Sequence, residues 1–382
     1  MYLHRTLQLE GLLEKKSHFL FGPRSTGKSS MIAKQLQQNA VVINLLKSDQ
    51  YLLLASKPWE LENLIAVQKN SIDIVVIDEI QRIPELLNEI HRLIEEKNLT
   101  FLLTGSSARK LYKQGQNLLA GRAWRAELFP FTYIEIPDFC LDDYLLYGGL
   151  PQVVTSNNKL EELDAYVSIY LKEEIQAEAL VRKINSFSVF LRMAAITNGT
   201  MLNFAKISND TGVPASTIRE YYKILEDTLV GYMLPAWNKS VQRKSISTAK
   251  FYFFDIGVRN TLVGINSLDK HSDSYGQAFE HFIAMELRAY LSYTRKKMEL
   301  TYWHTVYRHE VDFIVGDEIA IEVKCSDNIQ NKHLKGLKVL MEENICKKYY
   351  CVCFDNNHRM NGNVEIIPWE LFLKKLWDGL IV

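Results

Sequence analysis

The sequence lacks the features that mark secreted and membrane-embedded proteins. No stretch approaches the roughly 18 consecutive apolar residues of a membrane span, and residues 1–10 hold no apolar segment before a small-residue cleavage site. The five cysteines are odd in number, form no CxxC pair and lie mostly among apolar residues, as reduced buried thiols do. We therefore expect a soluble, cytoplasmic protein without a membrane partner.

An excess of charge of one sign is also lacking. Lys+Arg and Asp+Glu both number 45, so the molecule has no bulk field that would attract a polyanion. Binding to DNA would need local basic patches, and the overall balance neither supports nor excludes it. The hydrophobic fraction of 47% is ordinary for globular proteins, and a length of 382 residues favours two or three domains.

The first 150 residues alternate short apolar runs with amphipathic stretches. This alternation of strand and helix predicts an α/β domain with a parallel sheet flanked by helices. The segments that carry the pattern are residues 18–21, 29–37, 40–45, 73–78, 84–95 and 100–104. The Gly-Gly-Leu-Pro sequence at 148–151 marks the predicted end of this domain.

Residues 151–265 form the predicted middle domain. Helical periodicity runs from residue 161 to about residue 193, and residues 202–234 read as two helices joined by a tight turn at Gly212. Two strands, 232–237 and 250–255, then enclose a polar hairpin, which completes the outline of a winged helix.

Residues 266–382 form the predicted third domain, which is again α/β. Its expected elements follow the order helix, three strands, helix and strand. They occupy residues 277–291, 299–304, 310–315, 318–324, 332–341 and 348–354.

A glycine-rich segment between the first strand and the first helix predicts a phosphate-binding loop. Such a loop turns its backbone N–H groups toward phosphate oxygens at a helix N-terminus, which explains glycine at positions 22 and 27. Lys28 would reach the terminal phosphates of ATP, and Ser29 would offer its hydroxyl to Mg²⁺. The predicted nucleotide contacts are Gly22, Pro23, Arg24, Ser25, Thr26, Gly27, Lys28, Ser29, Ser30, Asp78 and Ser106.

Two acids end the buried strand 74–78. Asp78 is expected to hold Mg²⁺, and Glu79 to polarise the attacking water as the catalytic base. Ser106 follows the next strand and is a candidate sensor of the γ-phosphate, although simple helix capping is an alternative. Arg122 and Arg125 are candidates for an arginine that stabilises transferred charge, with solvated surface arginines as the alternative.

A second group of charged residues lies in the third domain. Asp312 and Glu322, on adjacent antiparallel strands, can converge on one Mg²⁺ or Mn²⁺, and Lys324 points to the same face as Glu322. This arrangement predicts catalysis of phosphodiester cleavage, with Glu280 as an additional metal ligand. The alternative is a set of solvated charges at the edge of a sheet.

The helix-turn-helix outline raises DNA as a partner of the middle domain. The second helix would present Ser216, Arg219 and Lys223 to a groove. The hairpin would add the cations Arg243, Lys244 and Lys250. The same fold also serves as a protein scaffold, and acidic residues on the second helix favour that alternative.

Over essentially its whole length the chain resembles the prokaryotic AAA-type P-loop ATPases that end in a PD-(D/E)XK nuclease-like domain. The resemblance rests on Gly22-Pro23-Arg24, Gly27-Lys28-Ser29, Asp78-Glu79-Ile80-Gln81, Thr104-Gly105-Ser106-Ser107, Gly121-Arg122, Tyr147-Gly148-Gly149-Leu150-Pro151, Phe253-Phe254-Asp255-Ile256-Gly257, Glu310-Val311-Asp312-Phe313 and Ile321-Glu322-Val323-Lys324. It implies an ATPase core, a winged-helix connector and a C-terminal α/β domain like that of restriction endonucleases.

The leading hypothesis is therefore an ATP-hydrolysing protein that acts on DNA through its C-terminal domain. The alternative is a nucleotide-dependent switch or scaffold whose second and third domains only bind partners. A small-molecule kinase fits less well, because the pair Asp78 and Glu79 suits the activation of water. Assembly into a homo-oligomer is a further expectation.

Overall fold

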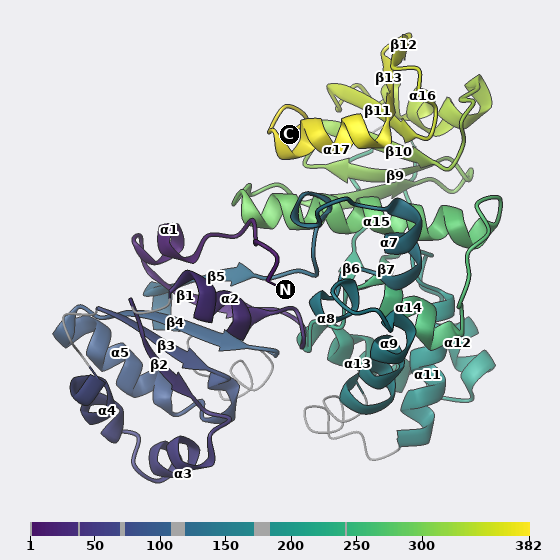
Figure 1. Cartoon of the computed structure of the whole chain (residues 1–382). Coiled ribbons are helices and arrows are strands. Elements are labelled where there is room, and N and C mark those ends of the chain that lie inside the picture. Colours follow the sequence, from purple (N-terminus) through teal and green to yellow (C-terminus); the bar gives the residue numbers. More distant parts are fainter. Residues whose placement is uncertain (1, 37–38, 69–72, 108–118, 172–183, 241–242) are drawn as a thin grey trace.

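The computed structural model describes residues 2–36, 39–68, 73–107, 119–171, 184–240 and 243–382. In these residues the strands form a five-stranded, a two-stranded and a six-stranded sheet. Figure 1 shows the five-stranded sheet and its helices at lower left, and the six-stranded sheet at the top above the long helix α15 (Asp273–Tyr293).

The five-stranded sheet is entirely parallel and has the order β2-β3-β4-β1-β5, which confirms the prediction for the first part of the chain. Its strands are β1 (Ser17–Phe21), β2 (Val41–Asn44), β3 (Ile74–Asp78), β4 (Thr100–Gly105) and β5 (Ala123–Glu127). Strand β4 lies between β1 and β3. Because all strands run the same way, their carboxyl ends meet at one edge, where parallel sheets bind ligands.

Helices cover both faces of this sheet, so its strands are buried on both sides. Helices α3 (Ser48–Ser56), α4 (Glu60–Gln68) and α5 (Leu86–Lys97) pack on the face that carries Phe19 and Phe21. Helices α1 (Leu9–Leu13) and α2 (Lys28–Gln35) pack on the opposite face, which carries Leu20.

The middle of the chain is mainly helical. Its elements are α7 (Leu141–Tyr147), α8 (Pro151–Val154), α9 (Lys159–Ala165), the π-helical turn η4 (Tyr166–Leu171), α11 (Ile184–Ile196), α12 (Phe204–Thr211), α13 (Ala215–Asp227), β6 (Gly231–Leu234), β7 (Lys250–Phe253) and α14 (Ile256–Val263). Helices α9 and α11 confirm both ends of the predicted helical stretch, whose part at 172–183 lies outside the described residues. Helices α12 and α13 flank the predicted turn at Gly212, which ends α12 with a φ of 67°.

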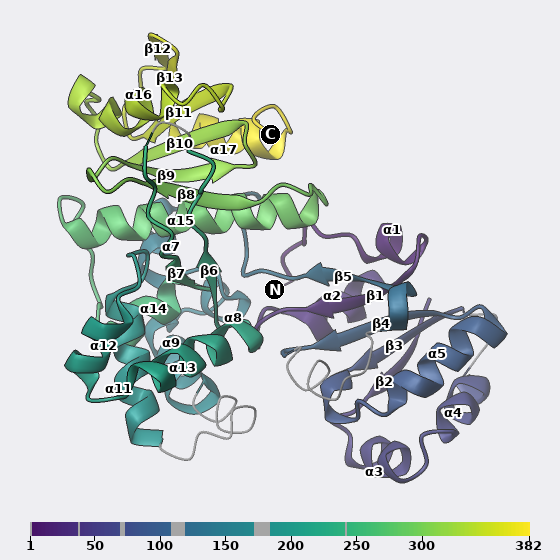
Figure 2. The ribbon, with the colours of Figure 1, turned by 180° about the vertical axis from the view of Figure 1, so that it is seen from behind.

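The segment between β6 and β7 follows a course that differs from the predicted exposed hairpin. Trp237 N donates to Tyr302 O at 2.7 Å and Ile246 N donates to His304 O at 2.8 Å, so the segment packs on the C-terminal sheet. Figure 2 shows it rising past α15 to reach that sheet.

Of the three cations expected to face DNA, Lys244 is exposed, whereas Arg243 and Lys250 pair with acids. Lys250 is only 3% exposed, because its ammonium lies between Glu280 and Glu310 at 3.3 and 2.7 Å. Arg243 pairs with Glu342. Acids from distant parts of the sequence neutralise both side chains, which disfavours a DNA contact through them, and DNA binding by this region stays a prediction.

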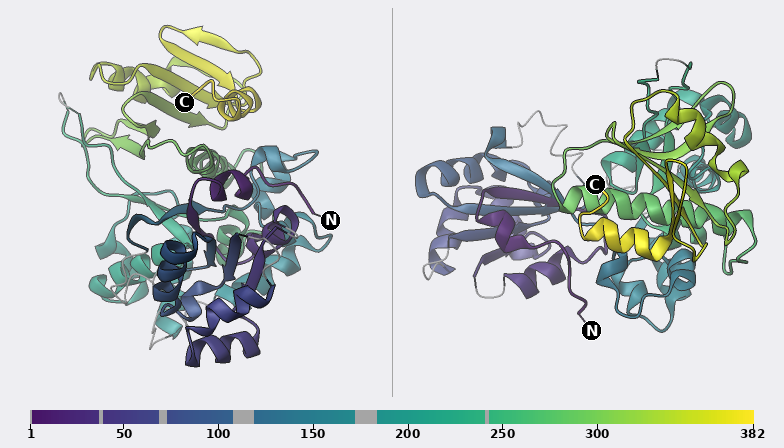
Figure 3. Two further views of the ribbon diagram at one scale, coloured as in Figure 1. Left: turned by 90° about the vertical axis from the view of Figure 1, so that its left-hand side faces the viewer. Right: turned by 90° about the horizontal axis from the view of Figure 1, so that it is seen from above.

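The C-terminal part confirms all six predicted elements and adds three more. After α15 come β8 (Leu300–His304), β9 (Glu310–Val315), β10 (Ile319–Lys324), α16 (Lys335–Met341), β11 (Lys348–Cys353), β12 (Arg359–Asn361), β13 (Val364–Pro368) and α17 (Trp369–Trp377). The strand order is β12-β13-β11-β10-β9-β8, with α15 and α17 on one face and α16 on the other. Figure 3 shows α15, in green, between this sheet and the rest of the chain.

Helix α15 also contacts the parallel sheet directly. Arg288 pairs with Glu127 of β5 at 3.2 Å, and Arg295 donates to the backbone of Arg125. Helix α7 packs in the same core as α15, so residues that precede position 150 belong structurally to this region as well. The division of the chain at residues 150 and 265 stays a prediction.

Candidate nucleotide-binding site

The glycine-rich segment forms a tight loop between β1 and α2. Gly27 has a φ of 89°, a backbone conformation that favours glycine, and it directly precedes the first residue of α2. At Gly22 an added Cβ would lie 2.5 Å from the carbonyl oxygen of Leu128, so only glycine fits there. Thr26 Oγ1 donates to Pro23 O at 2.8 Å and braces the turn. The loop therefore has the form that presents backbone N–H groups to an anion.

Lys28 is held inside this loop. Its side chain is 6% exposed, and Nζ donates to the carbonyl oxygens of Gly22 and Pro23 at 2.7 and 3.0 Å. A buried ammonium at the start of a helix is well placed for phosphate oxygens, whose charge makes them stronger acceptors than the loop carbonyls.

A cluster of oxygen atoms adjoins the loop. Ser29 Oγ donates to Asp78 Oδ2 at 3.0 Å, and Thr104 Oγ1 donates to Asp78 Oδ1. The three side chains come from α2, β3 and β4 and meet because β4 lies between β1 and β3. Hard oxygen donors of this kind suit Mg²⁺, so the residues present fit the metal that accompanies a nucleotide.

Glu79 follows Asp78 in the left-handed backbone region, with a φ of 65°. Its backbone N–H donates to Thr104 Oγ1 at 3.2 Å, and its carboxylate accepts a hydrogen bond from Gln81 Nε2. The same Nε2 lies 3.3 Å from Ser106 Oγ. The structure thus connects Ser106 to Glu79 through Gln81, a residue for which we predicted no role.

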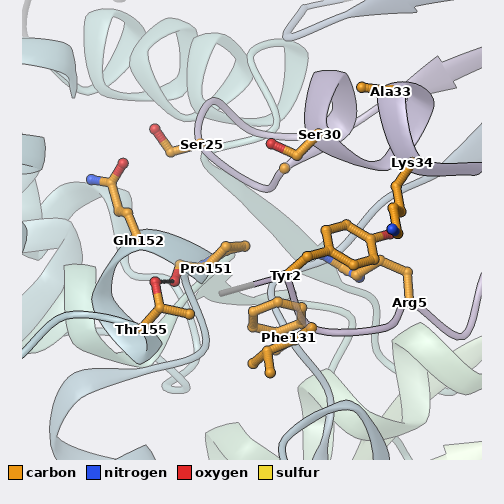
Figure 4. Close-up of a pocket in the computed structure, with 12 residues that line it drawn as sticks. Tyr2, Arg5, Ser25, Ser30, Ala33, Lys34, Phe131, Pro151, Gln152 and Thr155 are labelled. Carbon is orange, nitrogen blue, oxygen red and sulfur yellow. Dashed lines mark hydrogen bonds between the residues drawn. The ribbon is translucent and has the colours of Figure 1, made fainter. Parts of the chain in front are cut away.

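A cavity of about 670 Å³ opens beside the loop, within the usual size of small-molecule sites. Figure 4 shows Ser25 and Ser30 on one side of it and Gln152 and Thr155 of the α8 segment on the other. The complete lining is Tyr2, Leu3, Arg5, Ser25, Gly27, Ser30, Ala33, Lys34, Phe131, Pro151, Gln152 and Thr155. Ser25, Gly27 and Ser30 are among the predicted nucleotide contacts, whereas the other lining residues are not.

Arg5 ties the loop to the rest of the molecule. Nη1 donates to the backbone oxygen of Thr26 at 2.9 Å, and Nε pairs with Glu135 at 3.2 Å. Nη2 reaches Phe129 O at 2.6 Å and Tyr293 OH, in α15, at 3.3 Å. The residue was missed because its partners are up to 288 positions away.

The two arginines considered for charge stabilisation are engaged elsewhere. Arg122 immediately precedes β5. The first residue of β5 pairs with the first residue of β1, so Arg122 lies at the end of the sheet that is opposite to the loop. There its guanidinium group pairs with Glu95. Arg125 pairs with Glu127 at 2.5 Å. Both guanidinium groups are held by carboxylates of this chain, which favours the surface alternative.

The acids of the C-terminal sheet lie close together, as their spacing predicts. The β9 and β10 register, continued by one residue, sets Glu322 opposite Asp312. Lys324 Nζ lies 2.5 Å from Glu322 Oε1 and 3.8 Å from Asp312 Oδ2, while Val323 N donates to Asp312 Oδ2 at 2.7 Å. Burial, reinforced by Asp312, holds the pKa of Glu322 well above its usual range. Burial lowers the pKa of the Lys324 ammonium, but the two carboxylates outweigh burial and raise it.

Glu280 does not complete a metal site with these acids. Its Oε1 accepts hydrogen bonds from Tyr252 OH at 2.6 Å and Lys250 Nζ at 3.3 Å. Across the described residues, no three His, Cys, Asp or Glu side chains are grouped as ligands of one ion. Lys250 and Tyr252 engage Glu280, and Lys324 supplies the positive charge beside Asp312 and Glu322, so a metal site that includes Glu280 stays a prediction.

Three protein families match successive parts of the chain. A family described as an AAA domain matches residues 14–137. Residues 139–269 match a domain of unknown function, DUF8612, and residues 275–372 match another, DUF4143. None of the helices in the described part of the chain has both the length and the apolar character that a membrane span requires.

Similar proteins occur in bacteria and archaea. Uncharacterised proteins of Mycobacterium tuberculosis and Mycobacterium bovis are each 26% identical over 262 residues, which is 66% of this chain and 58% of each relative. The chain thus spans little more than half the length of these two relatives. An uncharacterised protein of Methanocaldococcus jannaschii is 23% identical over 97% of this chain and 91% of its own. The chain therefore contains an AAA domain of the P-loop ATPase type, followed by a C-terminal domain that matches DUF4143.

Proposed function

We propose that the protein binds ATP with Mg²⁺ and hydrolyses it at the loop between β1 and α2. The observation that carries this proposal is the meeting of Lys28, Ser29 and Asp78 at the carboxyl edge of a parallel sheet. Lys28 and the loop N–H groups would hold the phosphates, and Ser29 and Asp78 would hold the metal. Bound Mg²⁺ would neutralise charge on the phosphates, while Glu79 would accept a proton from the attacking water.

The cavity beside the loop supplies room for the nucleoside. It extends from Ser25 and Gly27 to the aromatic residues Tyr2 and Phe131. An adenine ring stacked or packed against such rings would bury apolar area, and the polar atoms of Gln152 are placed to select among bases. The base and the phosphates would then be bound by one continuous site.

The direct test is the release of inorganic phosphate from ATP by the full chain. We expect turnover with Mg²⁺ and none with excess EDTA, because the phosphates would lose their counter-charge. ATP left intact across a range of Mg²⁺ and protein concentrations would refute hydrolysis by this chain.

A second candidate function concerns the C-terminal sheet, where Asp312, Glu322 and Lys324 lie together. We propose that these residues cleave DNA with Mg²⁺ or Mn²⁺. Among the described residues Glu322 Oε2 is buried without a hydrogen-bond partner, and an acceptor in that situation suits a metal ligand. The metal would lower the pKa of a bound water, and Lys324 would orient it.

The middle region is proposed as a connector rather than as the main DNA contact. Arg219 stacks over the ring of Phe204 at 5.0 Å, and Lys223 pairs with Asp227 at 3.0 Å. Lys250 is buried as well. These three cations are therefore engaged by other groups of the protein, which makes them less accessible to DNA phosphates. A winged-helix fold and homo-oligomerisation stay predictions.

The nuclease proposal is tested by incubating plasmid and single-stranded DNA with the protein, with Mg²⁺ or Mn²⁺ and with or without ATP. We expect cleavage by the wild type that Asp312→Ala and Lys324→Ala each reduce by on the order of a hundredfold or more. Intact DNA in every condition, or cleavage by both variants as fast as by the wild type, would instead make the C-terminal domain a binding module under nucleotide control.

A further inference from the structure

We propose that Gln81 is a positioning residue that fixes the carboxylate of Glu79 for ATP hydrolysis, an inference that rests on the function proposed above. Gln81 lies in the short 3₁₀ turn Ile80–Arg82, immediately after the metal-binding strand, and is 5% exposed. Its Nε2 donates both to Glu79 Oε2 and to Ser106 Oγ. One amide thus connects the proposed catalytic base to the end of β4.

The chemistry of these groups fixes the orientation of the amide. An ionised carboxylate only accepts hydrogen bonds, so the nitrogen of Gln81 must face Glu79 and the oxygen must face away. That oxygen, Oε1, is buried and has no hydrogen-bond partner within the described part of the chain. An added Cβ on Gly105 would lie 2.6 Å from Oε1, so glycine at position 105 leaves the room that the amide needs.

An amide at this position would lower the stability of the protein if its only role were to fill space. A buried acceptor without a hydrogen-bond partner destabilises a protein, whereas leucine would fill a similar volume without that penalty. The amide nitrogen, by contrast, gives Glu79 a specific partner.

The other end of the link is firmly anchored. Ser107, next to Ser106, is fully buried, and its hydroxyl lies 3.3 Å from the backbone oxygen of Asp227 at the end of α13. Gln81 therefore connects Glu79 to the segment directly after β4, which contacts the middle helices. Loss of the amide would remove this hydrogen bond from the carboxylate while leaving Lys28, Ser29 and Asp78 in place.

Two variants test this role in the full chain. Gln81→Leu should lower kcat for ATP by about tenfold to a hundredfold, the range in which displacement of a catalytic group acts, with the Kd for ATP and the Tm nearly unchanged. Gln81→Glu should shift the acid limb of the kcat profile to higher pH, because two adjoining carboxylates disfavour the second negative charge and the base then binds its proton more tightly. A residue that only fills space would leave kcat unchanged when leucine replaces it.

The outcomes separate this inference from the proposed function. In a Glu79→Gln background, Gln81→Leu should have no further effect on turnover, since the group that it positions is already absent. Wild-type kcat in Gln81→Leu together with an unshifted profile in Gln81→Glu would overturn the positioning role while ATP hydrolysis stands. If Gln81→Leu does not fold, kcat of Gln81→Met, which also lacks the amide, decides in its place. Absence of turnover in the wild type would refute the proposed function itself.

Discussion

Glu79→Gln is expected to retain ATP with Mg²⁺ while its turnover falls by roughly 10²–10⁴, the usual effect of a lost general base. The substitution replaces one carboxylate oxygen by an amide nitrogen and keeps the shape of the side chain. Asp78 keeps its hydrogen bonds to Ser29 and Thr104, so the metal-binding oxygens are unaffected. Only the group that accepts a proton from water is removed.

The measurement is single-turnover phosphate release, made alongside a titration of nucleotide binding. Glu85→Gln is a matched control, because it removes an exposed carboxylate from the same segment six residues further on. Unchanged turnover in Glu79→Gln would move the general base to another residue. Loss of binding together with turnover would show that Glu79 holds the nucleotide rather than activates water.

Local sequence patterns predicted the parts of the site that lie next to one another in the chain. The spacing from Gly22 to Ser29 indicated the loop, and the apolar run before Asp78 indicated a strand that ends at the same edge. Thr104 was placed only by the order of the strands, which sets β4 between β1 and β3. No local pattern determines that order, so the hydrogen bond from Thr104 to Asp78 was not predicted, although the segment from Thr104 to Ser107 was expected to end beside the site.

The residues that were missed or misread have partners far away in the sequence. Arg5 binds Glu135 and the backbone of Thr26, and its contacts depend on how three segments come together. Lys250 reads as an exposed cation in a polar stretch, yet Glu280 and Glu310 neutralise it in the folded chain. Charge and burial at such positions follow from tertiary packing, which composition and periodicity do not determine.

The C-terminal acids show where prediction from sequence succeeded and where it ended. Alternation along β10 correctly placed Glu322 and Lys324 on one face, and the hairpin brought Asp312 opposite. The contacts of Glu280 were not predicted, because helical periodicity indicates which face of α15 is buried and not which groups its side chains contact. Glu280 contacts Lys250 and Tyr252 instead.

Lys28→Ala is expected to weaken ATP binding by on the order of a hundredfold or more, because each hydrogen bond from a charged group contributes about 1.5–3 kcal/mol. Lys28 Nζ already lies within the loop, against Gly22 and Pro23, so phosphate oxygens bound there would contact it. Lys47→Ala is the matched control, since it removes an exposed lysine from the same α/β region without altering the loop.

The decisive measurement is the Kd for ATP with Mg²⁺, obtained by calorimetry on the wild type, Lys28→Ala and Lys47→Ala, with the fold of each checked by its Tm. We predict measurable binding for the wild type and Lys47→Ala and its loss for Lys28→Ala at an unchanged Tm. Undiminished affinity in Lys28→Ala would contradict the assignment of the loop as the nucleotide site.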